Sequence, residues 1–121
     1  MKSILVIGIS RFGAHLCRNL VAQKNQLMII DKDETALEEL TPLVSSALIA
    51  DCTRRDVLEN VGVPDFDICF VCISDDFQAS LEITSLLKEL GAKHVVSVSR
   101  RDVHTKFLLR NGADEVINPD K

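Results

Sequence analysis

The chain is poor in aromatic residues: it has no tryptophan and no tyrosine, and only five phenylalanines among 121 residues. Without tyrosine it cannot form the tyrosine–lysine pair that some oxidoreductases use for hydride transfer. It also lacks an excess of basic residues, since 18 acidic side chains outnumber 14 basic ones and give a net charge of −4. A surface of this charge cannot replace the counterions around a nucleic acid, so no nucleic-acid partner is expected.

Long apolar runs are absent too. The longest purely apolar run is residues 68–73, far short of the roughly 20 residues that span a bilayer. The apolar segment near the N-terminus is too short for a secretion signal. We therefore expect a cytoplasmic protein with no direct membrane insertion. With 46% hydrophobic and 26% charged residues, residues 1–121 are expected to form one globular domain.

Four cysteines are present, and Cys69 and Cys72 have the C-x-x-C spacing of some metal and redox sites. The two lie in a strand-like run, however, where residues three apart point to opposite faces. There is no second pair with ligand spacing, and His15, His94 and His104 are scattered along the chain. The pattern predicts buried, reduced thiols and no metal site.

Short apolar runs alternate with amphipathic segments along the whole chain. This pattern is typical of a parallel sheet with helices on both faces. We predict strands near 2–7, 27–30, 47–50, 67–73, 94–98 and 115–117, and helices near 12–23, 33–42, 55–61, 76–90 and 102–111. The fold class is therefore α/β, a Rossmann-like doubly wound parallel sheet of six strands in the order 3-2-1-4-5-6. In this fold, ligands bind at the switch point between the first and fourth strands.

A glycine-containing turn joins the first strand to the first helix, and its six residues are Gly8, Ile9, Ser10, Arg11, Phe12 and Gly13. Such a turn holds phosphate groups, because unpaired backbone N–H groups and the helix dipole attract anions. The usual pattern is G-x-G-x-x-G; Ser10 stands at its second glycine, and its hydroxyl could bind a phosphate oxygen. Arg11 is unfavourable at a helix N-terminus, which favours a role in pairing with phosphates of its own ligand or a neighbour's. The Phe12 side chain is expected to pack against the sheet.

An acidic residue ends the predicted second strand. Asp31 lies 23 residues after Gly8, where a carboxylate can accept hydrogen bonds from both hydroxyls of a ribose. A carboxylate there repels a 2′-phosphate and disfavours NADP. The adjacent Lys32 could soften this preference, although its side chain is expected to point away. The alternative is that Asp31 simply opens the following helix.

Two further loops end strands at the same edge of the sheet. Asp51 and Cys52 lie where an adenine ring would bind, Asp51 as an acceptor for its amino group and Cys52 as an apolar wall. Alternatively, Asp51 or Thr53 caps the short helix that follows. Ser74 begins the loop that faces the central or distal part of the ligand, and one of the two acids after it is expected to cap the long helix.

The C-terminal third adds positive charge and apolar surface. Arg100 and Arg101 could place charge over the crevice or be solvated, and His104 is expected at a surface or an interface. The two long helices near 76–90 and 102–111 carry more apolar side chains than one sheet face can cover. We therefore predict self-association.

Several motifs together resemble one family: the 8–13 turn with its arginine and phenylalanine, Asp31, and the segments 50–53, 78–80 and 112–119. They are similar to the N-terminal lobe of RCK domains, also called KTN or Trk/Ktr-type domains, over essentially the whole chain. The resemblance implies a cytoplasmic regulator of a potassium channel or transporter that binds NAD(H), ATP, ADP or AMP and assembles as a homodimer or larger ring. It implies that phosphates are held by Gly8, Ser10, Arg11 and Gly13, the ribose by Asp31, and the adenine by Asp51 and Cys52.

Two residues depart from the family pattern, and both leave the identity of the nucleotide open. Ser10 replaces the second glycine, and Val98 stands where many relatives carry a lysine or arginine. The sequence ends at Lys121, where relatives continue into a second lobe, so we expect a one-lobe subunit or part of a longer chain without its C-terminal lobe.

The leading hypothesis is a regulatory nucleotide-binding subunit, not an enzyme. Its expected partner is the membrane subunit of a potassium transporter, which would place the chain at the inner membrane. The alternatives are a fragment of an NAD-dependent oxidoreductase and a scaffold whose pocket has decayed.

Overall fold

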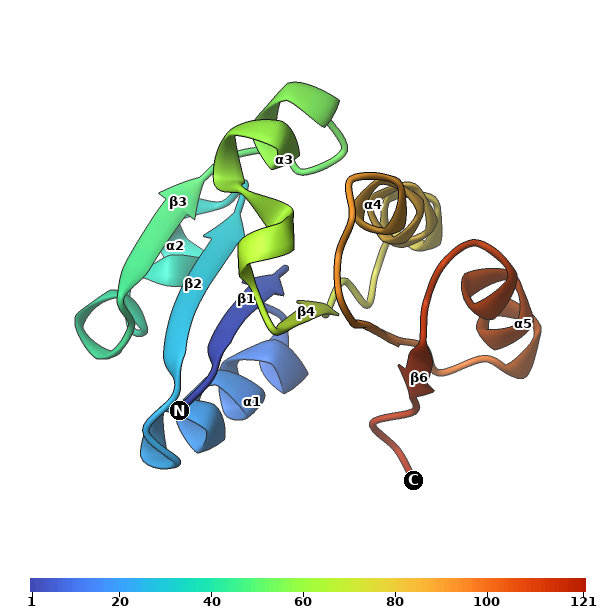
Figure 1. The fold of residues 1–121 in the computed structure, drawn as a ribbon. Coiled ribbons are helices and arrows are strands. Elements are labelled where there is room, and N and C mark those ends of the chain that lie inside the picture. The colour runs from blue at the N-terminus through green and yellow to red at the C-terminus, as the bar shows by residue number, and fades with distance from the viewer.

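All strands of the chain run parallel in one sheet, in the order β3-β2-β1-β4-β5-β6 (Figure 1). The computed structural model describes residues 1–121. The strands are β1 (Ser3–Ile7), β2 (Gln26–Asp31), β3 (Ser46–Ile49), β4 (Ile68–Val71), β5 (Val95–Val98) and β6 (Glu115–Ile117). The helices are α1 (Arg11–Ala22), α2 (Glu34–Leu37), α3 (Arg55–Val61), α4 (Phe77–Glu89) and α5 (Asp102–Arg110), with 3₁₀ turns at Thr41–Leu43 and Val63–Asp65. The predicted fold class and strand order are confirmed.

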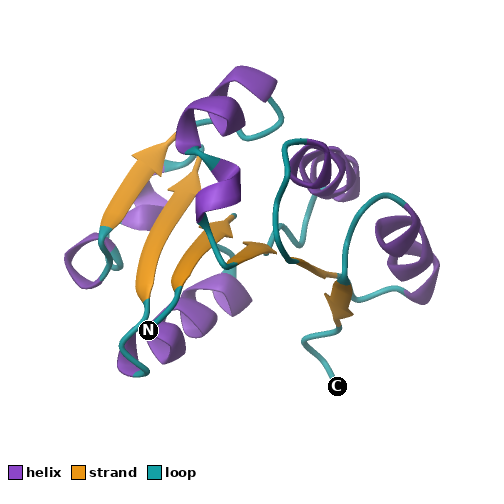
Figure 2. Ribbon diagram, in the orientation of Figure 1, coloured by secondary structure: helices purple, strands orange, loops and turns teal.

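Helices cover the sheet from both sides (Figure 2). α1 and α2 pack over one apolar cluster, which contains Ile4 and Val6 of β1, whereas α3 and α4 pack over a second cluster, which contains Leu5 and Ile7. Successive residues of β1 enter different clusters because strand side chains alternate between faces. Residues 4–7 are at most 2% exposed, as expected for a central parallel strand. None of the helices has both the length and the apolar character needed to cross a bilayer.

Two predicted elements extend two or more residues past their observed ends, whereas the other bounds differ by one residue at most. The helix expected to run to Pro42 ends at Leu37, and Pro42 instead lies at the start of a 3₁₀ turn. Proline disfavours the α conformation of the residue before it and donates no hydrogen bond, so the helix cannot continue to that point. The helix begins with a side-chain cap, because the Asp33 carboxylate accepts from the Thr35 amide at 3.0 Å. β4 ends at Val71 rather than at residue 73, because the chain leaves the sheet to enter the loop of Ser74.

The cysteines lie where the sequence pattern places them. Cys69 belongs to the cluster beneath α3 and α4, and Cys72 to the cluster beneath α1 and α2, so the two thiols lie on opposite faces of the sheet. All four cysteines are free and buried. Burial raises the pKa of Cys17 to about 11 and those of Cys69 and Cys72 to about 12. These side chains therefore act as small apolar groups in the core.

A buried pair of hydroxyl groups links α4 to β5. The side-chain oxygens of Thr84 and Ser97 are 2.7 Å apart, and both residues are fully buried. We expect Thr84→Val to lower the free energy of unfolding by about 1–3 kcal/mol, because it leaves the Ser97 hydroxyl buried without a partner. The double variant with Ser97→Ala removes the unpaired group and should recover part of the loss. Urea unfolding of the three chains measures this; a single variant as stable as the parent would contradict it.

Candidate functional site

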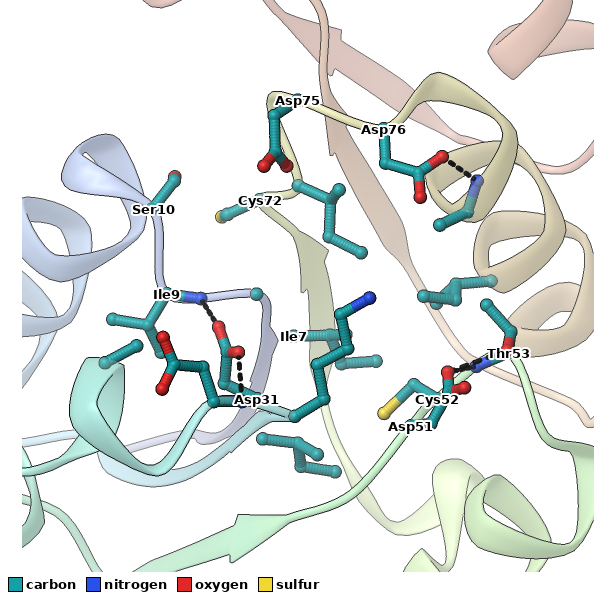
Figure 3. Close-up of a pocket in the computed structure, with 18 of the residues that line it drawn as sticks. Ile7, Ile9, Ser10, Asp31, Asp51, Cys52, Thr53, Cys72, Asp75 and Asp76 are labelled. Atoms are coloured by element: carbon teal, nitrogen blue, oxygen red, sulfur yellow. Dashed lines mark hydrogen bonds between the residues drawn. The ribbon is translucent and has the colours of Figure 1, made fainter.

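A cavity of about 800 Å³ lies at the carboxyl ends of β1, β2 and β4, over the switch point of the sheet (Figure 3). It brings together most of the residues that the sequence singles out: Gly8, Ile9, Ser10, Arg11, Asp31, Lys32, Asp51, Cys52 and Ser74. Phe12 and Gly13 do not line it. Phe12 packs, as predicted, against the cluster beneath α1, and Gly13 is buried in the contact between α1 and the turn.

The two glycines of the turn allow α1 to approach the sheet closely. Gly8 has a φ of +85°, in the left-handed region that favours glycine, and its amide donates to the Ile30 carbonyl at 2.9 Å. A Cβ on Gly13 would lie 2.7 Å from the Gly8 carbonyl oxygen. Gly13 therefore serves close packing of the helix, not direct contact with a ligand.

Ser10 is the N-cap of α1, and its side chain is already engaged. Its Oγ accepts a hydrogen bond from the Gly13 amide at 3.2 Å. The hydroxyl proton can still be donated to a ligand. The resemblance implied that Gly13 holds a phosphate, but its amide already donates to Ser10 and is not free to do so. The amides of Ser10, Arg11 and Phe12 have no acceptor within the chain. Unpaired N–H groups at a helix N-terminus favour an anion.

Asp31 ties the glycine turn to the end of β2. One carboxylate oxygen accepts from the Ile9 amide at 2.7 Å and the other from the Asp33 amide at 2.9 Å (Figure 3). Each oxygen keeps a further lone pair for a ligand. The alternative that Asp31 simply opens α2 is wrong, because Asp33 is the N-cap of that helix.

The prediction that Lys32 points away from the cavity is wrong. Lys32 lines the cavity, and its charge contributes to lowering the pKa of Asp51. The main cause of that lowering is Thr53, whose hydroxyl and amide both donate to one oxygen of Asp51, at 2.7 and 3.0 Å. The cap of α3 is Arg54, without a side-chain hydrogen bond. Neither Asp51 nor Thr53 caps that helix, so this alternative is wrong as well.

Cys52 forms a wall of the cavity next to Asp51 (Figure 3). It is only 4% exposed, and burial together with the nearby carboxylates of Asp51 and Asp31 raises its pKa to about 12. The thiol is therefore neutral at physiological pH and presents an apolar surface. This fits the predicted contact with a flat ring.

The sequence pattern missed the contribution of α4. Gln78, Ala79 and Glu82 line the cavity from the first turns of this helix, whose N-cap is Asp76, bonded to the Ala79 amide at 3.0 Å. Residues i and i+4 of a helix share a face, and α4 directly follows the switch-point strand β4. The i, i+4 spacing of Gln78 and Glu82 is therefore the sequence feature from which this side of the cavity could have been predicted.

The charge in the cavity is unbalanced. Six carboxylates line it, against two cations, Arg11 and Lys32. The Arg11 side chain is exposed and forms no ion pair in the chain, so it is available to a ligand. The sequence left open whether Arg100 and Arg101 lie over this crevice or are solvated. Both line a neighbouring cavity, and Arg100 pairs with Asp120 at 3.2 Å.

A parallel 3-2-1-4-5-6 sheet with a glycine turn, free helix amides and an acid at the end of β2 defines a Rossmann-like domain of the nucleotide-binding type. The chain belongs to the TrkA-N domain family, whose model matches residues 4–119. It is 37% identical over 120 residues to Ktr system potassium uptake protein C of Bacillus subtilis, covering 99% of this chain and 54% of that protein. The resemblance inferred from the motifs is thereby confirmed. The chain spans about half the length of the curated relatives it matches.

Solved structures share the fold at lower sequence identity. The TrkA-N domain of inner membrane protein ybaL from Escherichia coli superposes with a TM-score of 0.87 at 17% identity, covering 98% of this chain and 88% of that one. The GsuK channel bound to NAD gives a TM-score of 0.82 at 18% identity, covering 96% of this chain and 21% of the channel chain. The GsuK structure bound to ADP gives 0.81 at the same identity, covering 97% and 31%.

Proposed function

We propose that this chain is a regulatory domain that binds an adenine nucleotide, NAD(H) or ATP, ADP or AMP, and controls potassium transport through a membrane subunit. The observation that carries the proposal is the set of free amides at Ser10, Arg11 and Phe12 beside the Asp31 carboxylate in one cavity. The similarity to potassium uptake proteins supports the transport role, and the NAD and ADP of GsuK support the ligand class.

Each part of the nucleotide has a matching group in the cavity. The free amides and Arg11 would hold the phosphates next to the turn, with the Ser10 hydroxyl as a further donor. The remaining lone pairs of Asp31 would accept from the ribose hydroxyls. The free oxygen of Asp51 would accept from the adenine amino group, and Cys52 would contact the ring face.

The proposed domain binds its ligand without turnover. The main carboxylates of the cavity already accept hydrogen bonds: Asp31 from two amides, Asp51 from Thr53 and Asp76 from Ala79. Groups held in this way position a ligand. If the domain has two conformations that bind the nucleotide with different affinities, binding would favour one of them and so change the state of the attached membrane subunit. The domain would act in the cytoplasm at the inner membrane.

Calorimetric titration of the chain with AMP, ADP, ATP and NADH tests the proposal. We expect saturable binding of at least one of these adenine nucleotides at one site per chain. We also expect guanosine nucleotides to bind more weakly, because their ring offers a carbonyl oxygen to Asp51 where adenine offers an amino group. No heat with any of the four adenine compounds at millimolar concentration would contradict a nucleotide-binding role.

We also propose that the chain self-associates through α5. Val103 and Phe107, one helical turn apart, are 47% and 44% exposed, and the ring of Phe107 lies 6.4 Å from that of Phe77 on α4. We expect sedimentation of the parent chain to show a dimer or larger assembly and Phe107→Ser to weaken it about tenfold or more, since burying a phenylalanine contributes about 1.5–3 kcal/mol. Leu43→Ser is the matched control, because Leu43 is 47% exposed on another surface. A parent chain that is monomeric at every concentration would contradict this interface.

A further inference from the structure

A second cavity, of about 250 Å³, adjoins the first at the carboxyl ends of β4 and β5. The two cavities share the residues Ile73, Ser74 and Asp75. The second is walled by the N-terminal residues of α4 and α5, including Phe77 and His104, whose rings stack with centroids 3.8 Å apart. It is large enough for one small polar group reached directly from the nucleotide cavity.

Arg101 and His104, at the N-terminus of α5, line this cavity, and the helix has no side-chain cap. Arg101 is its N-cap residue and gives no side-chain hydrogen bond to the helix. The amides of Asp102, Val103 and His104 have no acceptor in the chain. Ser99 fixes the approach to the helix, because its hydroxyl donates to the Arg101 carbonyl at 3.0 Å. Free amides at the start of a nine-residue helix favour an anion.

An unpaired hydroxyl group in the same cavity independently indicates a polar ligand. The Ser80 hydroxyl has no hydrogen-bond partner although the residue is only 2% exposed, and it is the sole buried side-chain polar atom left unpaired. Ser80 lines the cavity. A buried hydroxyl without a partner is costly and uncommon in native proteins. A bound group that accepts from Ser80 would remove this cost.

The charges of the two cavities differ in sign. The first has six carboxylates and two cations, whereas the second has the cations Arg100 and Arg101 and one carboxylate, Asp75. Arg100 is partly neutralised by Asp120, and Arg101 forms no ion pair. A phosphate is therefore repelled along the acidic side of the first cavity and attracted toward the second.

We propose that the second cavity is a phosphate-binding subsite, in which Ser80, Arg101 and the first amides of α5 donate to one phosphate group; this rests on the nucleotide-binding role proposed above. The phosphate comes either from the distal end of a nucleotide whose adenosine occupies the first cavity or from free inorganic phosphate. Asp75 opposes the bound anion and limits its affinity.

Calorimetry with AMP, ADP, ATP and inorganic phosphate distinguishes these sources. With a distal phosphate as the ligand, we expect Ser80→Ala and Arg101→Gln each to weaken ADP or ATP about tenfold, the contribution of one hydrogen bond to a charged group, and to leave AMP unchanged. With free phosphate as the ligand, the parent chain binds it and both variants lose that binding, while all nucleotides are unaffected. Asp75→Asn should tighten the same ligand, because it removes the opposing charge.

Arg110→Gln is the matched control, since it removes one exposed positive charge at the other end of α5. If Ser80 has only a structural role, Ser80→Ala raises the melting temperature and changes no affinity. Equal affinities in all variants for ADP, ATP and phosphate would overturn the subsite while AMP binding still supports the nucleotide role. If none of AMP, ADP, ATP and NADH binds, the nucleotide role fails, and the phosphate titration alone decides the subsite.

Discussion

Replacing Asp31 with asparagine is expected to weaken nucleotide binding by roughly 10- to 100-fold, because hydrogen bonds to a charged carboxylate contribute about 1.5–3 kcal/mol. The carboxylate oxygens of Asp31 accept from the Ile9 and Asp33 amides at 2.7 and 2.9 Å, and each keeps a further lone pair for the proposed bonds to a ribose. Asparagine retains one acceptor and places an amide donor where the second stands. The substitution therefore removes part of the proposed ribose contact and weakens the bonds that position the turn.

The preference for NADH over NADPH distinguishes loss of the ribose contact from loosening of the turn. If Asp31 contacts the ribose, the variant should lose affinity for NADH while the ratio of NADPH to NADH affinity rises, because the charge that repels a 2′-phosphate is gone. A variant that merely loosens the turn weakens both nucleotides equally. Glu38→Gln is the matched control for charge, since Glu38 is exposed and lies outside the cavity. Calorimetry at constant ionic strength measures both ratios, and an affinity equal to that of the parent would place the ribose elsewhere.

Gly8→Ala should cause a large loss of stability. Gly8 has a φ of +85°, and a Cβ there would lie 2.6 Å from Cγ1 of Ile73 and 3.2 Å from its backbone nitrogen. The left-handed conformation costs a residue with a Cβ about 1–2 kcal/mol, and crowding against backbone adds about 1–3 kcal/mol. We expect the free energy of unfolding, measured by urea unfolding, to fall by about 2–5 kcal/mol.

Gly91→Ala separates conformational strain from crowding. Gly91 has a similar φ of +92°, but the nearest atom to its Cβ would be Pro64 Cγ at 3.4 Å, an ordinary contact. It should lose only the conformational part, about 1–2 kcal/mol. Equal losses at the two positions would show that the approach of the turn to β4 is looser than the distances indicate.

The fold could be predicted because its signals are local and repeat along the chain. The buried run of β1 and the caps at Asp33 and Asp76 follow from periodicity and from the chemistry of single residues. The end of α3 at Gly62, with a φ of +82°, follows in the same way. The parallel order then follows from the alternation of strands and helices.

The site was predicted only in part, since side-chain direction and pairing depend on the packed structure. Sequence position placed Lys32 beside Asp31 but could not show that it lines the cavity. The motif could not show that the Ser10 oxygen already accepts from the Gly13 amide as the N-cap of α1. The unpaired Ser80 hydroxyl is a property of the whole packing around α4, which no local pattern reveals.

A crystal structure of the chain grown with saturating ADP would locate the ligand directly. We expect a phosphate within hydrogen-bond distance of the Ser10, Arg11 and Phe12 amides, and the ribose hydroxyls on Asp31. Clear density for the protein with no nucleotide in the cavity, or with ADP bound away from the glycine turn, would contradict the proposed binding site.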